Sequence, residues 1–481
     1  MQPKHASPSR PSAVSSTRGP SLILRPALAA LIMLVLAAGL SAQRLEIGPS
    51  EVKERRERLC KELGDPSAAD GAVRGTVFLF SATTPTIGVR FRQDHDFFYF
   101  TGNEDKNAAV AIEVPSCKAW LFLPPQTERE ASRDGWNWLY QEGAEKRWGF
   151  ETIHPLHYFD EFIARRRVAG PQTAYVRLSE RDRIDQSRTD AALYFGRRLA
   201  NPWGGQPSED AWRATQLRQR YPFFELRDVT PAVDELRMHK TAFEIEALRR
   251  NGRISAKAIE RAIAATAPGR YEYELEAEST HEMVKSGAEH AAYAAIIGSG
   301  ANGNIWHYNS NGDRLEDGEL IVMDYGASLA YQTMDITRTW PVSGRFTPLQ
   351  RRAYAAVLEA EKAIIAAMKP GVTRAETRAI ARAIFDKHGF PGHYPGGAGH
   401  FVGMAVHDVG DYSRPLEEGM VIAVEPIIEI PEEHLHIRIE DTVLITATGA
   451  ENLSDTVPKE IDEVLALVGR DVRSAGQPSG R

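Results

Sequence analysis

Four carboxylates in the C-terminal half stand where a metal centre could use them. Asp324 and Glu425 each end an apolar, strand-like run, and an acidic residue at the end of a buried strand is uncommon unless it is bound to something. Asp335 and Glu440 follow them at corresponding places. Any one of the four alone would more often be a solvated strand end. Buried together they would repel one another, whereas two divalent ions would let all four stay ionised, so the set predicts a two-metal site.

Histidine and arginine side chains extend the candidate site. His400 follows a glycine-rich stretch that allows close approach, and its neutral imidazole would complete the ligand set. A lone histidine is more often a core or surface residue, so His307 and His407 are candidates for stabilising an oxyanion or moving a proton instead. Period-2 alternation places Arg438 on the same strand face as Glu440, where it could orient a ligand carboxylate.

The same half contains an internal duplication. Residues 315–324 match residues 416–425, since in each a Glu-Asp-Gly or Glu-Glu-Gly turn leads into an apolar strand that ends in a carboxylate. His307 and His407 also correspond. The repeat predicts a half-domain that folds against its own copy about a pseudo-twofold axis, with a carboxylate pair from each copy.

The N-terminal half has the pattern of an α/β domain without an obvious catalytic cluster. Short apolar runs separated by turn-rich stretches predict strands, and amphipathic stretches predict helices around them. The expected strands are 76–80, 97–100, 108–112 and 120–123, and the expected helices are 51–63 and 159–167. Thr230-Pro231 interrupts the pattern before a helix expected at 241–265.

Length and composition bound the alternatives. A chain of 481 residues exceeds what one hydrophobic core usually organises, and a net charge of −7 without a dominant basic run argues against nucleic acid as a partner. The two cysteines, Cys60 and Cys117, lie far from every ligand candidate, so no cysteine-type metal site is expected. The sequence leaves open whether they form a disulfide or remain buried thiols.

The first residues are typical of an export signal. Three arginines precede an uncharged apolar run at 27–40, which is shorter than the roughly 20 residues of a membrane span and ends in Leu-Ser-Ala before Gln43. We therefore predict cleavage near Ala42 and a periplasmic or secreted protein, with an uncleaved anchor as the alternative. The expected organisation is a signal peptide (1–42), an N-terminal domain (43–230), a catalytic domain (231–468) and a flexible tail (469–481).

These residues resemble those of the pita-bread metallopeptidases, specifically the aminopeptidase P (Xaa-Pro aminopeptidase) family. The matching motifs are Val322-Met-Asp-Tyr-Gly326, Asp335-Ile-Thr-Arg-Thr339, Gly399-His-Phe-Val-Gly403, Val406-His-Asp-Val-Gly410, Val424-Glu-Pro426 and Arg438-Ile-Glu-Asp-Thr442. In the N-terminal half, residues 91–102 resemble the family's N-terminal domain motif. The resemblance covers most of the mature chain and implies an α+β protein with an N-terminal α/β domain and a duplicated pita-bread catalytic domain.

The resemblance also implies the arrangement of the ions. Asp335 and Glu440 would bridge two metal ions, Asp324 would complete the coordination of one, and His400 with Glu425 that of the other. Manganese is the family's usual metal and suits a carboxylate-rich site, although one imidazole also admits Co²⁺ or Zn²⁺. A homo-oligomer is implied as well.

The expected reaction is metal-assisted hydrolysis that releases the N-terminal residue of a peptide with proline in second position. Glu425 would relay the proton to the departing nitrogen, while His307 and His407 hold the substrate or the tetrahedral intermediate. The alternatives are a prolidase that takes only Xaa-Pro dipeptides and a pita-bread fold kept as a non-catalytic binding protein. A creatinase-like metal-free hydrolase is disfavoured because all five ligand candidates are present, and no Gly-x-Ser-x-Gly motif supports serine catalysis.

One position departs from the family pattern. Relatives commonly have a histidine four residues before the ligand histidine, and this chain has Gly396 there. The metal ligands are unaffected, but the residues that contact the substrate are left open.

Overall fold

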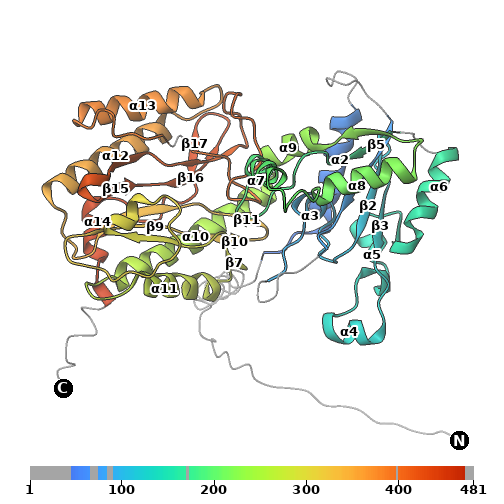
Figure 1. The fold of residues 1–481 in the computed structure, drawn as a ribbon, viewed down its shortest axis with the longest axis horizontal. Coiled ribbons are helices and arrows are strands. Elements are labelled where there is room, and N and C mark those ends of the chain that lie inside the picture. The colour runs from blue at the N-terminus through green and yellow to red at the C-terminus, as the bar shows by residue number, and fades with distance from the viewer. Residues whose placement is uncertain (1–44, 65–73, 84–89, 170–172, 397–398, 472–481) are drawn as a thin grey trace, which may run out of the picture. The chain divides into compact units, whose positions relative to one another are not determined.

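The computed structural model describes most of the chain outside the predicted signal peptide, which lies beyond the described part together with the last ten residues of the predicted tail (Figure 1). No helix in the described part is long and apolar enough to cross a membrane. The described residues are 45–64, 74–83, 90–169, 173–396 and 399–471.

The N-terminal half is built on a six-stranded mixed sheet with the order β4-β3-β2-β1-β5-β6. Its strands are β1 (Gly75–Phe80), β2 (Ala109–Val114), β3 (Ala119–Leu123), β4 (Thr152–Pro155), β5 (Thr173–Val176) and β6 (Glu225–Asp228). Alternate residues of β1 enter two different cores, Val77 on one face and Phe78 on the other. The strands predicted at 76–80, 108–112 and 120–123 are confirmed as β1, β2 and β3.

The fourth predicted strand, 97–100, is wrong because this segment forms the helix α3 (His95–Thr101). Asp94 caps the helix by accepting a hydrogen bond from the Phe97 amide, and Gly102 ends it in the left-handed conformation. The helix is buried on all sides, which explains the apolar run that resembles a strand.

The N-terminal half also has eight α-helices in its described residues. They are α2 (Pro49–Gly64), α3, α4 (Glu128–Asp134), α5 (Ala144–Trp148), α6 (Phe159–Ala169), α7 (Arg188–Ala200), α8 (Glu209–Arg220) and α9 (Thr230–Met238). The predictions at 51–63 and 159–167 are confirmed as α2 and α6. Cys60 of α2 and Cys117 form a disulfide, with their Cα atoms 5.8 Å apart.

The C-terminal half repeats one order of elements twice, so that two helices are followed by strands. The first copy has α10 (Ala242–Ala265), α11 (Glu272–Lys285), β7 (His290–Ala291), β8 (Ile296–Ser299), β9 (Leu320–Asp324), β10 (Ala327–Leu329), β11 (Gln332–Thr333) and β12 (Thr337–Pro341). The second has α12 (Pro348–Ala367), α13 (Arg374–Lys387), β13 (Val421–Val424), β14 (Ile427–Ile430), β15 (Leu435–Arg438), β16 (Asp441–Ile445) and β17 (Ala450–Asn452), before α14 (Ile461–Leu467). The helix predicted at 241–265 is confirmed as α10.

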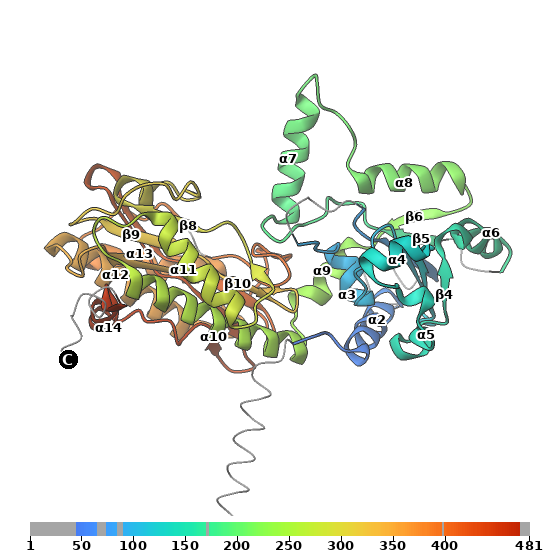
Figure 2. The same ribbon diagram turned by 90° about the horizontal axis from the view of Figure 1, so that it is seen from below.

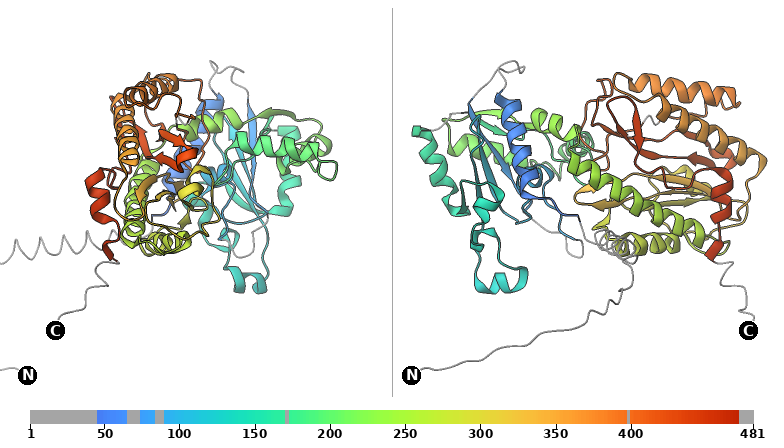
Figure 3. Two further views of the ribbon diagram at one scale, coloured as in Figure 1. Left: turned by 60° about the vertical axis from the view of Figure 1, so that its left-hand side comes forward. Right: turned by 180° about the vertical axis from the view of Figure 1, so that it is seen from behind.

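The C-terminal half has two hydrophobic cores, one built mainly from each copy. The strands lie between the helix pair α10 and α11 and the pair α12 and α13 (Figures 1 and 3), and α11 with α10 covers them in the view from below (Figure 2). Ile259 and Ile321 belong to the first core, and Val357 and Ile437 to the second. With helices on both sides of strands from two copies, the fold is the α+β pita-bread arrangement that the sequence predicts.

Candidate active site

The five predicted ligands lie together between the two copies. Their ligand atoms fall into overlapping groups, within each of which all atoms lie within 4.8 Å of one another. These groups are Asp324 with Asp335 and Glu440; His400 with Glu425 and Glu440; and Asp335 with His400 and His407. Asp335, His400 and Glu440 each belong to two of the three groups, so the groups form one continuous cluster.

Strand register brings the carboxylates to one place. Asp324 ends β9 opposite Thr337 of β12, and the Glu440 amide donates to the Thr337 carbonyl at 3.0 Å, which joins the second copy to the first. The Asp335 amide donates to the Thr442 hydroxyl at 3.2 Å, and this hydroxyl donates back to the Asp335 carbonyl at 2.8 Å. Hydrogen bonds between the two copies therefore fix the backbone positions from which the Asp335 and Glu440 side chains extend.

Arg438 lies where the alternation of β15 places it, against a ligand carboxylate. Its Nη2 donates to Asp324 Oδ2 at 2.7 Å, and its Nε donates to the Thr337 hydroxyl at 2.9 Å. That hydroxyl donates to Glu440 Oε2 at 2.6 Å. One buried guanidinium thus orients two ligand carboxylates, one of them through a threonine.

Tyr293 joins the site without a signal in the sequence. Its phenol contacts Asp324 Oδ1 at 2.6 Å and Asp335 Oδ1 at 2.7 Å. Burial and these two carboxylates raise the pKa of Tyr293 well above its usual value, so the phenol is a donor at any physiological pH. The residue stands in an Ala-Ala-Tyr-Ala-Ala stretch that matches no motif.

The electrostatics of the ligand set favour bound cations. Burial and the charge of Asp335 raise the pKa of Asp324 to about 7, and burial with Asp335 and Glu425 raises that of Glu440 well above its usual value. Burial opposes ionisation of Asp335 as well, but the hydrogen bond and charge of His400 outweigh it and lower the pKa to about 2. Glu440 Oε1 is buried without a hydrogen-bond partner in the described structure. Divalent ions would satisfy this atom and stabilise the ionised carboxylates, so the residues fit a two-metal centre.

The two other histidines are placed differently. The rings of His400 and His407 have centroids 4.0 Å apart, and the charge of His400 followed by burial lowers the pKa of His407 to about 4. His307 is exposed on the turn after the 3₁₀ helix Gly300–Asn304, and its effect on the pKa of His407 puts it within electrostatic reach. The structure therefore brings His407 into the site and leaves His307 outside the ligand groups.

The space beside Gly396, where the family pattern has a histidine, is unfilled in the described structure. A Cβ at Gly396 would meet no atom of the described structure within 4 Å, and residues 397 and 398 lie outside the described part. The nearby His393 has its Nδ1 3.3 Å from the Glu429 carbonyl oxygen.

We expect metal binding to release protons at pH 7. Ligand carboxylates must be ionised and a ligand imidazole neutral, whereas in the metal-free protein Asp324 has a pKa of about 7 and His400 a pKa of about 9. Since both groups lose protons on coordination, the affinity for Mn²⁺ should rise with pH and level off only above about pH 9, where His400 is also deprotonated. Calorimetric titration in buffers of different ionisation enthalpy measures the release, and a value of zero at pH 7 would contradict this account.

Carboxylates and a histidine that converge from two copies of one half-domain define a two-metal hydrolase. The chain matches the family model "Metallopeptidase family M24" over residues 246–447 and the model "Aminopeptidase P, N-terminal domain" over residues 52–174. It is 32% identical over 460 residues to the Xaa-Pro aminopeptidase of Escherichia coli (strain K12), which covers 88% of this chain and 98% of the relative. The chain belongs to the Xaa-Pro aminopeptidase (aminopeptidase P) family and is a metal-dependent peptide hydrolase.

Solved structures support this placement. Aminopeptidase P from E. coli with the inhibitor Pro-Leu superimposes with a TM-score of 0.73 at 28% identity, covering 90% of this chain and 100% of that one. Proline aminopeptidase P II from Yersinia pestis does so with a TM-score of 0.73 at 29% identity, covering 88% and 99%. Over 236 residues the chain is also 39% identical to the Xaa-Pro dipeptidase of Pyrococcus furiosus, covering 48% of this chain and 67% of the relative.

Proposed function

We propose that this protein removes the N-terminal residue from peptides whose second residue is proline. The observation that carries the proposal is the convergence of all five ligand candidates in overlapping groups beside His407. The bond before proline is a tertiary amide without an N–H, and the ring fixes the backbone, so peptidases that rely on that donor bind it poorly. Cleavage of this bond therefore calls for a site that does not rely on that N–H.

Different residues have different roles in the proposed hydrolysis. Two divalent ions in the site would make a nucleophile available near neutral pH and polarise the scissile carbonyl. Glu425 accepts the proton of the attacking water and passes it to the proline nitrogen as the carbon–nitrogen bond breaks. His407 faces the same space and donates a hydrogen bond to the carbonyl oxygen as negative charge develops on it. Arg438 and Tyr293 hold Asp324 in place throughout.

Manganese is our proposal for the metal. Four carboxylates and one imidazole form a hard ligand set that suits Mn²⁺, with Co²⁺ and Zn²⁺ as the alternatives. Metal analysis of protein purified without added metal, followed by activity after reconstitution with each ion, would decide among them.

We further propose that the mature chain is exported and forms a homo-oligomer. The leader pattern of residues 1–42 supports export, and so does the disulfide between Cys60 and Cys117, because disulfides persist in oxidising compartments. N-terminal sequencing of the protein from the periplasm or medium tests cleavage near Ala42, and sedimentation measures the number of subunits.

The activity is tested by comparing two substrates. Mature protein loaded with Mn²⁺ is expected to release Xaa from an Xaa-Pro-Yaa tripeptide faster than it cleaves the matching Xaa-Pro dipeptide. Dipeptide preference would instead support the prolidase alternative, which the identity to the P. furiosus dipeptidase favours. No metal-dependent turnover of either peptide would support a non-catalytic binding protein and direct attention to Gly396.

A further inference from the structure

A buried ion cluster joins the N-terminal half to the loop that carries His407. Arg237 of α9, which is 1% exposed, donates to Asp96 at 2.9 Å and to Asp182 at 2.7 Å. The same guanidinium donates to Asp408 Oδ1 at 2.7 Å. Asp408 is the residue after His407, so Arg237 connects two carboxylates of the N-terminal half directly to the histidine loop.

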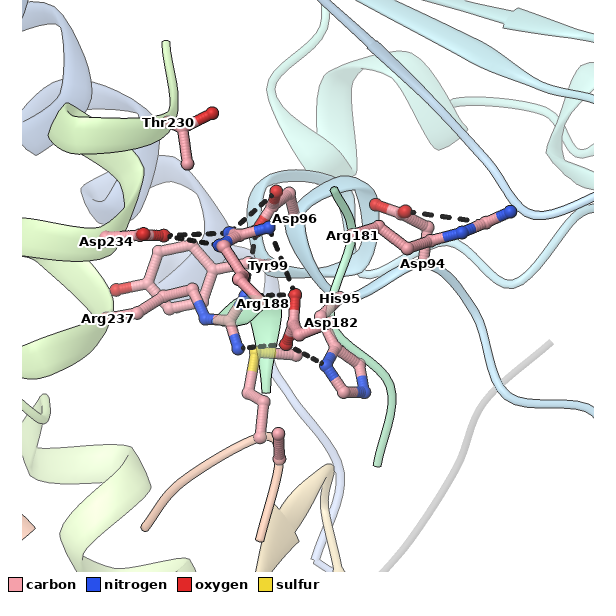
Figure 4. Close-up of polar contacts among 12 residues, drawn as sticks. Asp94, His95, Asp96, Tyr99, Arg181, Asp182, Arg188, Thr230, Asp234 and Arg237 are labelled. Atoms are coloured by element: carbon pink, nitrogen blue, oxygen red, sulfur yellow. Dashed lines mark hydrogen bonds and ion pairs between the residues drawn. The ribbon is translucent and has the colours of Figure 1, made fainter. Parts of the chain in front are cut away.

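The anchoring carboxylates are fixed independently of Arg237. Asp182 lies 2.7 Å from His95 Nδ1 and 3.2 Å from an Arg188 nitrogen, and Arg188 also bonds Asp96 at 3.0 Å (Figure 4). Burial opposes ionisation of both carboxylates, but Arg237 with Arg188 lowers the pKa of Asp182, and Arg188 with Arg177 and Arg237 lowers that of Asp96. The cluster therefore holds the Arg237 guanidinium between carboxylates whose own positions are fixed.

Both chain neighbours of His407, Val406 and Asp408, are held by backbone hydrogen bonds. The Val406 amide donates to the Ile184 carbonyl at 2.7 Å, and Ile184 lies two residues after the Asp182 that anchors Arg237. On the other side, the Asp408 amide closes the loop by donating to the Phe401 carbonyl at 2.8 Å. His407 thus has one tether on each side.

The loop has little room to shift around these tethers. A Cβ at Gly403 would collide with the carboxylate of Asp408, and Lys240 Nζ lies 3.3 Å from that same carboxylate. Lys240 also donates to the Arg237 carbonyl at 2.6 Å, which links it back to α9. Close packing and a second cation fix the carboxylate that Arg237 binds.

We infer that Arg237 is a positioning residue of the peptidase site, which holds His407 in place through Asp408. The inference rests on the proposed function. Buried ion pairs are poor sources of stability, whereas a displacement of about 1 Å at a catalytic group can cost about 10²-fold in rate. The structure thereby makes the N-terminal half part of the catalytic machinery.

The test is a double-mutant cycle. Asp408→Asn and Arg237→Lys are chosen because each keeps shape or charge and is expected to fold, and each is made alone and with His407→Ala. We expect each variant to lower kcat about 10- to 100-fold with both metal ions retained, and to have less than about a twofold further effect when His407 is already alanine. Effects that multiply in the double variants, an unchanged kcat in the single ones, or loss of metal would overturn the inference.

Arg177→Lys is the matched control. Arg177 is a similarly buried arginine that bonds Asp94, Asp96 and Asp210 but does not contact the histidine loop, so its variant should keep kcat. Hydrogen exchange of residues 401–408 supplies a readout that does not depend on turnover. Exchange should increase in Arg237→Lys and not in Arg177→Lys, and equal exchange in the two variants would contradict the tether. If the native protein cleaves no Xaa-Pro peptide, the proposed function fails while the exchange measurement still decides the tether.

Discussion

Asp335→Asn is expected to abolish metal-dependent turnover. Asp335 belongs to two of the ligand groups, accepts a hydrogen bond from Tyr293 at 2.7 Å and lies 3.2 Å from His400 Nε2. An amide offers one neutral oxygen in place of two charged ones, so the site loses a ligand shared between the ions. Since metal stabilisation of the transition state is worth several kcal/mol and about 1.4 kcal/mol is tenfold, activity should fall on the order of 10³-fold or more. Metal content by mass spectrometry and release of the N-terminal residue are the measurements.

Asp317→Asn provides the control for this variant. Asp317 lies on the Glu-Asp-Gly turn before β9, is 64% exposed and pairs only loosely with Arg345 at 3.8 Å. The same chemical change there should leave metal content and activity intact. Normal activity in the Asp335 variant would falsify the ligand assignment.

Arg338→Met is expected to give the largest loss of stability. Arg338 is 0% exposed, and its guanidinium bonds Asp441 at 2.7 Å and the Glu440 carbonyl at 2.6 Å. Methionine would leave the Asp441 carboxylate without this partner, although Lys459 remains beside it. Removing one member of a buried pair costs about 3–5 kcal/mol, so the urea midpoint should fall accordingly.

The control here is Arg345→Met. Arg345 is 78% exposed, and a surface substitution of this kind changes the free energy of unfolding by less than about 0.5 kcal/mol. Equal stability of the two variants would show that the ion pair with Lys459 alone is enough to stabilise the buried Asp441 carboxylate. Because Arg338 also holds the Glu440 backbone, we expect its variant to bind metal more weakly even where it remains folded.

The features with short-range causes could be predicted from the sequence. The helix α10 begins after Thr241, whose side chain caps it in a reciprocal pair with Glu244, and β9 ends at Asp324 as its apolar run indicates. The duplication is informative because two copies of one pattern constrain each other, and both copies fold with helices followed by strands in the same order. Residues at corresponding places, such as Asp335 and Glu440, could therefore be assigned to one site before any coordinates.

The remaining features depend on contacts between distant segments. Tyr293 reaches Asp335 only because β7 pairs with β10 and β8 pairs with β9, and nothing in its neighbourhood in the sequence indicates this. Arg237 bonds Asp408 across 171 positions, a pairing that one sequence cannot reveal. The error at α3 has a different cause, since a fully buried helix of seven residues has no solvent-exposed face and its period cannot be distinguished from that of a buried strand.

The division of the ligands between two copies also bears on how such a site can arise. One copy alone offers Asp324 and Asp335, and the other offers Glu425 and Glu440. A half-length chain would have to associate with a second molecule about a twofold axis to enclose two ions, and the fraction assembled would depend on its concentration. Joining the copies in one polypeptide makes their association intramolecular, so the site persists at any dilution. Each copy is then free to diverge, as the single ligand histidine of the second copy shows.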